Sequence, residues 1–330
     1  MTGQTLLFFS GEDIRKALPM REAVEVMKEA YARLSAGEAQ MPVRSSMAIP
    51  ERGGSALFMP SALPHEDQMG LKIVTIFDDN VGRGLPRIQA LMIVLDGSTG
   101  SPVAVMDGSV LTALRTGAGS GAATDLMARR EVARAAIFGA GVQGRTQLEA
   151  VCAVRPIDRV RVFDRDVAAA RTYAEEMACS LGIAVEAAAT PRECLAEADV
   201  VCTATTSPTP VFEDRDLQAG AHINAVGSYL PAVQEIPLET VVRARVAVDH
   251  RGSALAETGD LIIPIEQGYT AEDLIDAEIG EIAGGVAAGR ATEDEITLFE
   301  SVGVAIQDLA AAARILQKGR SLELGTEVSL

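Results

Sequence analysis

Three cationic side chains lie in segments that are otherwise apolar or small. Arg44 lies in PVRSSMAI, Lys72 in GLKIVTIF and Arg115 in LTALRTGAGSGA. Burying a cation without a partner is costly, so each of them requires an anion. That anion is either an Asp or Glu in an internal ion pair or a substrate carboxylate, which suits the planar fork of arginine. A lysine desolvated beside arginines has a lowered pKa and can exchange a proton near neutral pH.

A glycine-rich motif, Gly139-Ala-Gly141-Val-Gln-Gly144, follows a predicted strand and opens a predicted helix. In such a motif the first glycine permits a tight turn, the second lets the backbone approach a pyrophosphate, and the third allows close helix–strand packing. The helix N-terminus offers free N–H groups to the phosphates. Asp164, twenty residues after Gly144, ends the next predicted strand, where an acid binds ribose hydroxyls. The motif therefore predicts a dinucleotide site.

The residues after this strand bear on the choice of dinucleotide. Asp164 favours NAD, because its carboxylate repels a 2′-phosphate, whereas the adjacent Arg165 keeps NADP as an alternative. Two further strand ends, Thr203-Ala204-Thr205 and Val226-Gly227-Ser228, are expected at the same edge of the sheet, where nucleotide and substrate meet. The alternative interpretation of both segments is ordinary turn chemistry.

The N-terminal third predicts a different architecture from the middle of the chain. Ser10 and Asp13 predict the start of a helix over 11–17, and apolar spacing predicts a second helix that begins near Met20 and ends before Gly37. Successive strands follow between residues 41 and 105, and a helix rich in small residues is expected from about 109 to 128.

From Ala135 onward, short apolar strands alternate with helices, which is typical of a parallel sheet covered on both faces. A last helix is expected from Val302 to about Gln317. We therefore predict an α/β fold: a Rossmann doubly wound parallel sheet over 121–304, plus a discontinuous α+β domain made of 1–120 with 305–330. The charge supports this division, because residues 121–304 carry a net charge of −15 and both ends are nearly neutral.

Composition excludes several classes of protein. A net charge of −17 argues against nucleic acid or an anionic membrane as the partner. Three histidines and four cysteines show no metal-ligand spacing, so no metal is expected, and the unclustered cysteines indicate a reducing compartment. Neither a basic leader nor an apolar run of membrane-spanning length is present in the sequence, so we expect a cytoplasmic protein.

At this point the chain resembles the ornithine cyclodeaminase/mu-crystallin family. The resemblance rests on LFMPSAL, GLKIV, GLPRIQALMIVLDGSTGSPVAVMDGSVLTALRTGA, FGAGVQG, INAVGS and TLFESVGVAIQD, in that order over nearly the whole chain. It implies that the discontinuous domain binds substrate and forms a homodimer, while the Rossmann domain binds the cofactor. Members include cyclodeaminases, alanine dehydrogenases, ketimine reductases and a thyroid-hormone-binding crystallin.

The resemblance also assigns roles to residues. It implies that Arg44, Lys72 and Arg115 hold a substrate carboxylate, with Lys72 as proton donor or acceptor, and that Tyr229 and Glu257 lie near the substrate. The implied cofactor-binding residues are Thr116, Gly139, Ala140, Gly141, Val142, Gln143, Gly144, Asp164, Arg165, Thr203, Ala204, Thr205, Val226, Gly227, Ser228 and Ser301.

One departure from the family pattern bears on the reaction. Cyclodeaminases carry an acid in the turn after the fifth strand of the Rossmann domain, and this chain has Tyr229 there. We therefore expect an NAD(P)-dependent oxidoreductase that interconverts a small 2-amino acid and its 2-imino, cyclic ketimine or 2-oxo form. The alternatives are a cyclodeaminase-type lyase that uses bound NAD+ and a non-catalytic binding protein for NAD(P)H and a carboxylate ligand.

Overall fold

The computed structural model describes residues 5–329, which divide into two compact units. Unit 1 comprises residues 1–115 and 304–330, and unit 2 comprises residues 116–303. The boundary lies inside helix α3 (Gly108–Met127), five residues before the expected position, because this helix continues without a break from one unit into the other. Each unit has its own sheet, and together they confirm the predicted α/β fold class.

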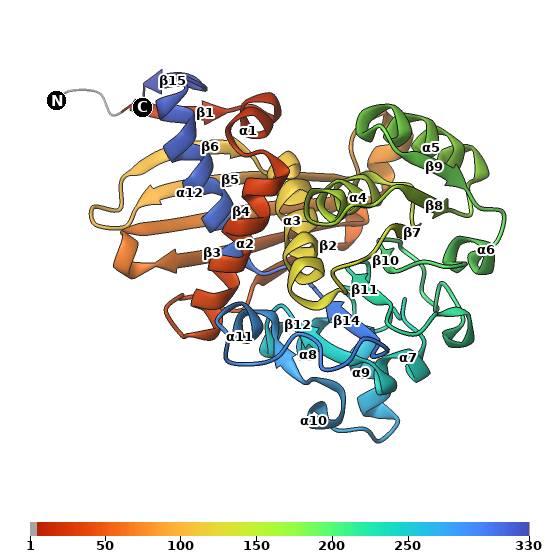
Figure 1. The fold of residues 1–330 in the computed structure, drawn as a ribbon. Coiled ribbons are helices and arrows are strands. Elements are labelled where there is room, and N and C mark those ends of the chain that lie inside the picture. Colours follow the sequence, from red (N-terminus) through yellow and green to blue (C-terminus); the bar gives the residue numbers. More distant parts are fainter. Residues whose placement is uncertain (1–4, 330) are drawn as a thin grey trace. The chain divides into compact units, whose positions relative to one another are not determined.

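Unit 1 is built on a seven-stranded mixed sheet with the order β15-β1-β6-β5-β4-β3-β2 (Figure 1). The strands are β1 (Thr5–Phe9), β2 (Ser45–Ile49), β3 (Gly54–Leu63), β4 (Gln68–Phe77), β5 (Ile88–Asp96), β6 (Pro102–Asp107) and β15 (Thr326–Ser329). Short 3-10 turns lie at Pro50–Arg52, Pro64–Glu66 and Asp78–Arg83. The first and last strands were not predicted.

The helices of unit 1 cover one face of this sheet. Helix α12 (Ala305–Ser321) packs on β3, β4 and β5, and helix α2 (Met20–Ser35) packs on α12 (Figure 1). Helix α1 (Gly11–Ala17) begins with the predicted cap, in which Ser10 and Asp13 bond each other's backbone N–H groups. The sequence prediction placed α12 three residues too early and ended it four residues too soon.

Cross-strand register in unit 1 sorts side chains into two opposite rows. On the inner face, under α12, one row runs through Met59, Lys72, Met92, Met106 and Phe9. The four apolar members of the row are buried, and Lys72 is only 1% exposed. Because successive side chains of a strand alternate between faces, a lysine flanked by Leu71 and Ile73 points into the core.

Unit 2 contains an eight-stranded parallel sheet with the order β13-β12-β14-β11-β10-β7-β8-β9. The strands are β7 (Arg134–Phe138), β8 (Arg159–Phe163), β9 (Ala184–Ala187), β10 (Val200–Thr203), β11 (His222–Ala225), β12 (Arg245–Val248), β13 (Ala277–Glu278) and β14 (Thr297–Glu300). The chain starts in β7, builds outward to β9 and returns to β10 on the other side of β7. This reversal is the position at which doubly wound sheets bind ligands.

Helices lie on both faces of this sheet, and each face has its own apolar core. The helices are α4 (Val142–Val154), α5 (Val167–Leu181), α6 (Pro191–Leu195), α7 (Leu238–Arg243), α8 (Arg251–Glu257), α9 (Gly259–Glu266), α10 (Ala271–Leu274) and α11 (Ile279–Ala283), with a 3-10 turn at Asp214–Asp216. Helices α4 and α5 cover one face, together with Ile137, Val160 and Val200 of the strands. No helix within residues 5–329 is long and apolar enough to span a bilayer.

Candidate active site

The predicted cations Lys72 and Arg115 meet at one carboxylate in unit 1. Lys72 Nζ lies 2.7 Å from Oδ2 of Asp308, and Arg115 Nε lies 2.9 Å from its Oδ1. All three side chains are buried. The internal ion pair, one of the two partners that the sequence left open for these cations, is therefore present.

Gln307 extends this cluster on α12. Its Oε1 accepts hydrogen bonds from Arg115 Nη1 at 2.8 Å and from the Val304 N–H at 2.9 Å. Its Nε2 donates to the hydroxyl of Tyr31 at 2.6 Å. The Arg115 guanidinium is thus oriented by two hydrogen bonds, from Nε to Asp308 and from Nη1 to Gln307. Nη2 takes part in neither of them.

The surroundings of Lys72 change its acidity. Burial among methionines, together with the positive charge of Arg115, lowers the pKa of Lys72 to about 7, while Asp308 opposes the shift. The charge of Arg44 acts in the same direction as that of Arg115, although Arg44 itself is half-buried and lies in the loop before β2. At neutral pH, Lys72 is therefore poised to hold or release a proton.

Sequence reasoning missed Asp308 and Gln307. Both belong to the segment TLFESVGVAIQD, which carries part of the family resemblance. The available signal was a Gln-Asp pair inside an otherwise apolar helix start, where a buried carboxylate requires cations. Their shared partner Arg115 is 192 residues from Gln307 and 193 from Asp308 in the chain, so no local pattern identifies them.

The glycine-rich turn of unit 2 lies between β7 and α4, as predicted. Gly139 has φ +102°, and a Cβ there would lie 2.5 Å from the Ala204 carbonyl oxygen. A Cβ on Gly144 would lie 2.1 Å from the Gly139 carbonyl oxygen, so this position requires glycine for packing. Gly141 differs, because nothing lies within 4 Å of the position of its Cβ. The open space at Gly141 and the absence of a side-chain cap on α4 leave backbone N–H groups for a phosphate.

Two side chains brace this turn from behind. The buried Tyr173 donates from its hydroxyl to the Gly144 carbonyl oxygen at 2.8 Å. The Arg145 guanidinium lies 5.2 Å above the Tyr173 ring, donates to the Gly141 carbonyl oxygen at 3.1 Å and pairs with Glu176. The turn is therefore held in place without any ligand.

A cavity of about 510 Å³ opens beside the turn at the carboxyl ends of β7, β8 and β10. Its lining includes Gly139, Gly141, Asp164, Arg165 and Thr205. Asp164 accepts hydrogen bonds from the Ala140 N–H at 2.8 Å and from the Asp166 N–H at 2.9 Å, which fixes its carboxylate at the end of β8. The Arg165 side chain is exposed at the same rim.

The predicted residues at the other strand ends are largely engaged by the protein. Thr205 donates from its backbone and its hydroxyl to the buried Glu235. The Ser228 hydroxyl donates to the Val233 carbonyl oxygen at 2.6 Å, and the Ser301 hydroxyl bonds Asp249 at 2.8 Å. These two hydroxyl groups are thus committed to internal bonds, whereas the buried Thr203 hydroxyl at the end of β10 has no hydrogen-bond partner.

The remaining predicted residues are spread over unit 2. Thr116 lies in α3, where its carbonyl oxygen accepts from Gln147 at 3.4 Å, and Glu257 is the half-buried last residue of α8. Tyr229 lies in the loop after β11 and is half-buried. The others lie at the turns described above: Val142 and Gln143 begin α4, Thr203 ends β10 and Ala204 follows it, and Val226 and Gly227 follow β11.

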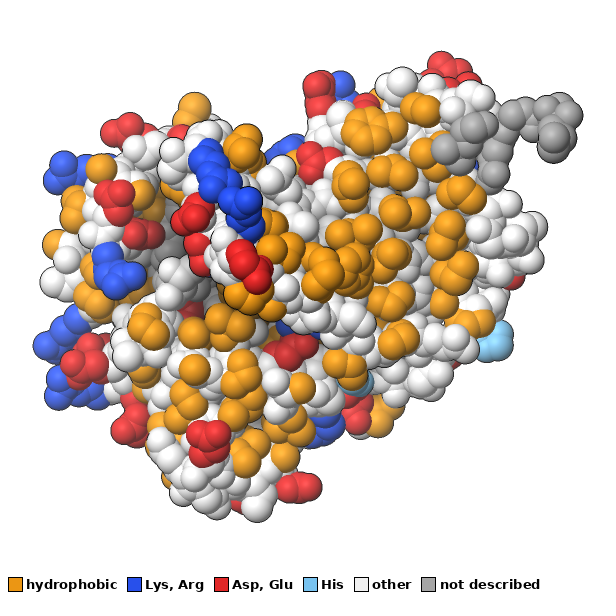
Figure 2. All heavy atoms as spheres, turned by 180° about the vertical axis from the view of Figure 1, so that it is seen from behind, with side chains coloured by type: hydrophobic (Ala, Val, Ile, Leu, Met, Phe, Trp, Pro, Cys, Tyr) orange, Lys and Arg blue, Asp and Glu red, His pale blue; other side chains and the backbone are white. Residues whose placement is uncertain are grey.

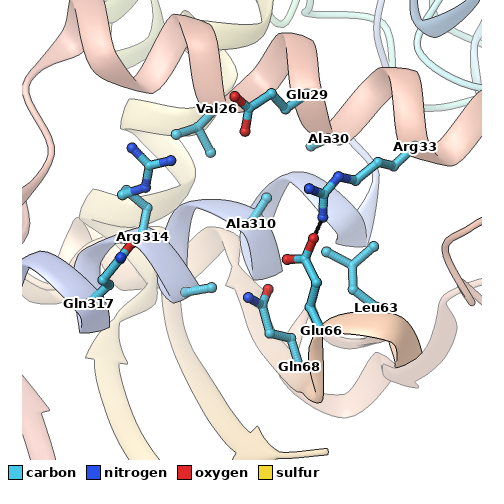
Figure 3. Close-up of a pocket in the computed structure, with 11 residues that line it drawn as sticks. Val26, Glu29, Ala30, Arg33, Leu63, Glu66, Gln68, Ala310, Arg314 and Gln317 are labelled. Carbon is cyan, nitrogen blue, oxygen red and sulfur yellow. Dashed lines mark ion pairs between the residues drawn. The ribbon is translucent and has the colours of Figure 1, made fainter.

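A second cavity, of about 370 Å³, lies in unit 1 between α2, α12 and the turn that joins β3 to β4 (Figure 3). Arg33 and Glu66 form an ion pair across it, and Arg314 of α12 points toward it (Figure 3). None of the predicted site residues lines this cavity. We therefore assign no part of the site to it.

Comparison with known proteins agrees with this arrangement. The model of the ornithine cyclodeaminase/mu-crystallin family matches residues 6–322. A Delta(1)-pyrroline-2-carboxylate reductase from Bacillus cereus is 36% identical over 324 residues, which are 98% of this chain and 99% of that protein.

Solved structures show the same relationship. Thermococcus litoralis Delta(1)-pyrroline-2-carboxylate reductase, in complex with NADH and L-proline, is 39% identical, with a TM-score of 0.94 and coverage of 98% of this chain and 100% of that one. An archaeal alanine dehydrogenase dimer with bound NAD is 32% identical, with a TM-score of 0.92 and coverage of 99% and 100%. The chain belongs to the ornithine cyclodeaminase/mu-crystallin family, as its sequence motifs predicted.

Proposed function

We propose that the protein is an NAD(P)-dependent imino-acid reductase, with Delta(1)-pyrroline-2-carboxylate as its substrate and L-proline as its product. The observation that carries this proposal is the buried Lys72–Arg115–Asp308 cluster, which combines a carboxylate-binding guanidinium with a lysine whose pKa is about 7. The similarity to reductases of this substrate at 36% and 39% identity supports the choice of substrate.

The dinucleotide would be bound by unit 2. The open space at Gly141 and the uncapped N-terminus of α4 accept the pyrophosphate, and Asp164 faces the ribose hydroxyls. Asp164 makes NAD the preferred cofactor, and Arg165 is the group that would accommodate NADP. When bound, the reduced cofactor supplies a hydride to the imine carbon.

The substrate carboxylate would be bound by Arg115 and Arg44. Asp308 and Gln307 fix Nε and Nη1 of Arg115, so its Nη2 is presented in a set orientation. A fixed guanidinium positions the imine carbon as well as binding the carboxylate, which lowers the barrier to hydride transfer. Lys72 Nζ would give a proton to the imine nitrogen as the carbon is reduced, and Asp308 would stabilise the protonated lysine beforehand.

Tyr229 further favours reduction over cyclodeamination. The family resemblance implies that a cyclodeaminase has an acid at this position to handle amino groups, and a phenol does not supply that charge. An imine reduction requires only the carboxylate-binding group, a proton donor and the cofactor. The available side chains therefore suit the simpler redox reaction.

The function can be tested by NADH oxidation at neutral pH against a panel of imino acids, with proline detected as product. The panel contains Delta(1)-pyrroline-2-carboxylate, piperideine-2-carboxylate, iminosuccinate, and pyruvate with ammonia. We expect stoichiometric NADH consumption and proline formation with the first compound. Formation of proline and ammonia from ornithine without net NADH change, or the absence of turnover on the whole panel, would refute the proposal.

We also propose a homodimer that forms through the outer face of the unit 1 sheet. A row of apolar side chains crosses this face through Pro60, Leu71, Ile93, Val105 and Phe8. Figure 2 shows apolar side chains gathered here with few charges among them. An apolar sheet face of this extent requires a covering partner, and the similar alanine dehydrogenase is described as a dimer. A second copy of the chain supplies a matching face.

A cytoplasmic location is also proposed. All four cysteines (Cys152, Cys179, Cys194 and Cys202) are free thiols. Burial raises the pKa of Cys194 and Cys202 to about 12, which keeps them unreactive. Free thiols are typical of proteins in reducing compartments.

A further inference from the structure

Three carboxyl groups are buried beneath the carboxyl edge of the unit 2 sheet. Glu235 lies in the loop after β11, Asp260 in the first turn of α9, and Glu300 at the end of β14, and none of them is exposed to solvent. Each has one oxygen in hydrogen bonds and one oxygen without a hydrogen-bond partner. No ion pair with a cation exists for any of the three within residues 5–329. Burying carboxyl groups without a counter-ion and with an unsatisfied oxygen lowers the free energy of unfolding, so this cluster calls for a functional explanation.

Glu235 differs from the other two because it touches two strand ends at once. Its Oε1 accepts the Thr205 N–H at 2.8 Å and the Thr205 hydroxyl. Its Oε2 lies against Gly227, where an added Cβ would be 2.1 Å away. One side chain therefore joins the segment after β10 to the segment after β11.

Thr205 transmits this contact to the glycine-rich turn. The Thr205 Cγ2 methyl lies 3.3 Å from the position of a Cβ on Gly139, and Thr205 lines the cavity of about 510 Å³. A chain of direct contacts thus runs from Glu235 through Thr205 to the turn. Loss of the carboxylate would release Thr205 and move a wall of the cavity.

Charge distribution in the cluster supports a specific role for Glu235. Burial raises the pKa of Asp260 to about 8 and that of Glu300 well above its usual value, so both keep their protons at neutral pH. Burial also raises the pKa of Glu235, but the two hydrogen bonds from Thr205 oppose this shift. Glu235 is therefore the member of the three whose hydrogen bonds from a cavity-lining residue, Thr205, counteract the effect of burial.

We propose that Glu235 is a positioning residue for the dinucleotide site. Its carboxyl group holds Thr205 against the glycine-rich turn and fixes the position of Gly227 relative to Thr205. This inference rests on the proposed use of the unit 2 cavity for NADH. Glu235 does not contact the dinucleotide itself and affects its binding through Thr205.

The test measures the Kd of NADH, in the absence of substrate, for wild type and the variants Glu235→Ala and Glu235→Gln. Losing both hydrogen bonds between Thr205 and Glu235 is expected to raise the Kd about tenfold in Glu235→Ala. Glu235→Gln keeps an acceptor oxygen for Thr205 and is expected to recover part of the affinity. The KM for NADH should follow the Kd, while kcat at saturating NADH changes less.

Asp199→Asn provides a matched control at the opposite end of the same strand, β10. The Asp199 carboxylate bonds the Ala133 and Arg134 N–H groups and Arg129, so it also joins separate segments, but at the amino edge of the sheet. Its substitution is expected to lower the melting temperature and leave the Kd of NADH unchanged.

The outcomes separate the inference from the proposed function. If wild type does not bind NADH, the cofactor proposal and this inference both fail. If wild type binds NADH and folded Glu235→Ala or Glu235→Gln binds it equally well, only the role of Glu235 is refuted. Weakening by Asp199→Asn to the same extent would show a general loss of stability and would also refute it.

Discussion

At the scale of single residues, Asp308 is the centre of the site in unit 1. It is the shared counter-ion of Lys72 and Arg115, and with Lys72 protonated the three side chains form a cluster with a net charge of +1. An excess positive charge in a buried setting is stabilised by a ligand of opposite sign, and a substrate carboxylate supplies it. The composition of the cluster therefore matches the proposed class of substrate.

Removing the Asp308 carboxylate should strongly destabilise the folded protein. Asp308→Ala leaves Lys72 and Arg115 buried without their anion, so we expect the free energy of unfolding to fall by about 3–5 kcal/mol. Arg314→Ala, which breaks a partly exposed pair with Glu22 on the neighbouring helix α2, should cost about 0–1 kcal/mol. Urea denaturation measures both, and equal losses in the two variants would contradict the assigned role of Asp308.

The pH dependence of the reaction should follow Lys72. Since the pKa of Lys72 is about 7, its proton-donating form predominates below this pH and is lost above it. We expect kcat/KM for imine reduction to fall about tenfold per pH unit above about pH 7. Steady-state kinetics across this range provides the measurement, and a flat profile would exclude Lys72 as the proton donor.

At the scale of elements, the turn between β7 and α4 has one closely packed glycine and one that faces open space. Gly144 is required by contact with the Gly139 carbonyl oxygen, whereas the space beside Gly141 is open. The two glycines therefore serve different purposes within one motif. The sequence motif predicted this division, and the observed contacts assign it to individual positions.

Two alanine substitutions distinguish these purposes. Gly141→Ala should keep the melting temperature of wild type but weaken NADH binding at least tenfold, because the methyl group would occupy space needed for the pyrophosphate. Gly144→Ala should lower the melting temperature, because its Cβ would clash with backbone. Thermal denaturation and NADH titration measure both effects. Unchanged NADH affinity in Gly141→Ala would contradict the placement of the pyrophosphate.

The start of helix α9 should give unit 2 a pH-dependent stability. The pKa of Asp260 is about 8 in the folded chain and near its usual value of 3.8 when unfolded. The folded state thus holds a proton that the unfolded state releases, so this contribution is complete below about pH 4 and is lost as pH rises through about 8. We expect the melting temperature to fall between pH 5 and 9 in wild type and to fall less in Asp260→Asn. An identical pH dependence in both proteins would exclude Asp260 as the source.

Elements with local signals were predictable from sequence, and those that depend on distant pairing were not. The cap at Ser10, the turn at Gly139 and the helix after it follow from neighbouring residues. Strand β14 has only four residues and lies between β11 and β12, although it follows both in the chain. Likewise, Lys72 and Arg115 were expected to require an anion, but Asp308 becomes their neighbour only when α12 packs on the sheet.

At the scale of the whole molecule, the net charge of −17 is distributed unevenly. Unit 2 carries −15 of it, although that unit would bind a negatively charged dinucleotide. Backbone N–H groups at the uncapped start of α4 would resolve this apparent conflict, because such groups can bind phosphate without a cationic side chain. Overall acidity therefore describes the surface and does not predict the charge of the ligands.

The proposed dimer can be tested on the sheet of unit 1. Leu91 is 47% exposed on the apolar outer face, beside Ile73 in the cross-strand register. We expect wild type to be a dimer and Leu91→Lys to dissociate, because the charge would be buried between the subunits. Val286→Lys, at an 82% exposed position of unit 2, is the control. Light scattering after size-exclusion chromatography measures the mass, and a dimeric Leu91→Lys or a monomeric wild type would refute this interface.

We propose that the Lys72–Arg115–Asp308 cluster recognises the carboxylate of a cyclic imine. The most direct test compares kcat/KM of the wild-type protein for Delta(1)-pyrroline-2-carboxylate and for the same ring without its carboxylate, with NADH as reductant. A site built around buried polar groups rejects a ligand that leaves them unpaired by about 10⁴-fold. We predict a preference of this order for the carboxylated imine. Equal kcat/KM values for the two imines would show that the cluster does not recognise the carboxylate.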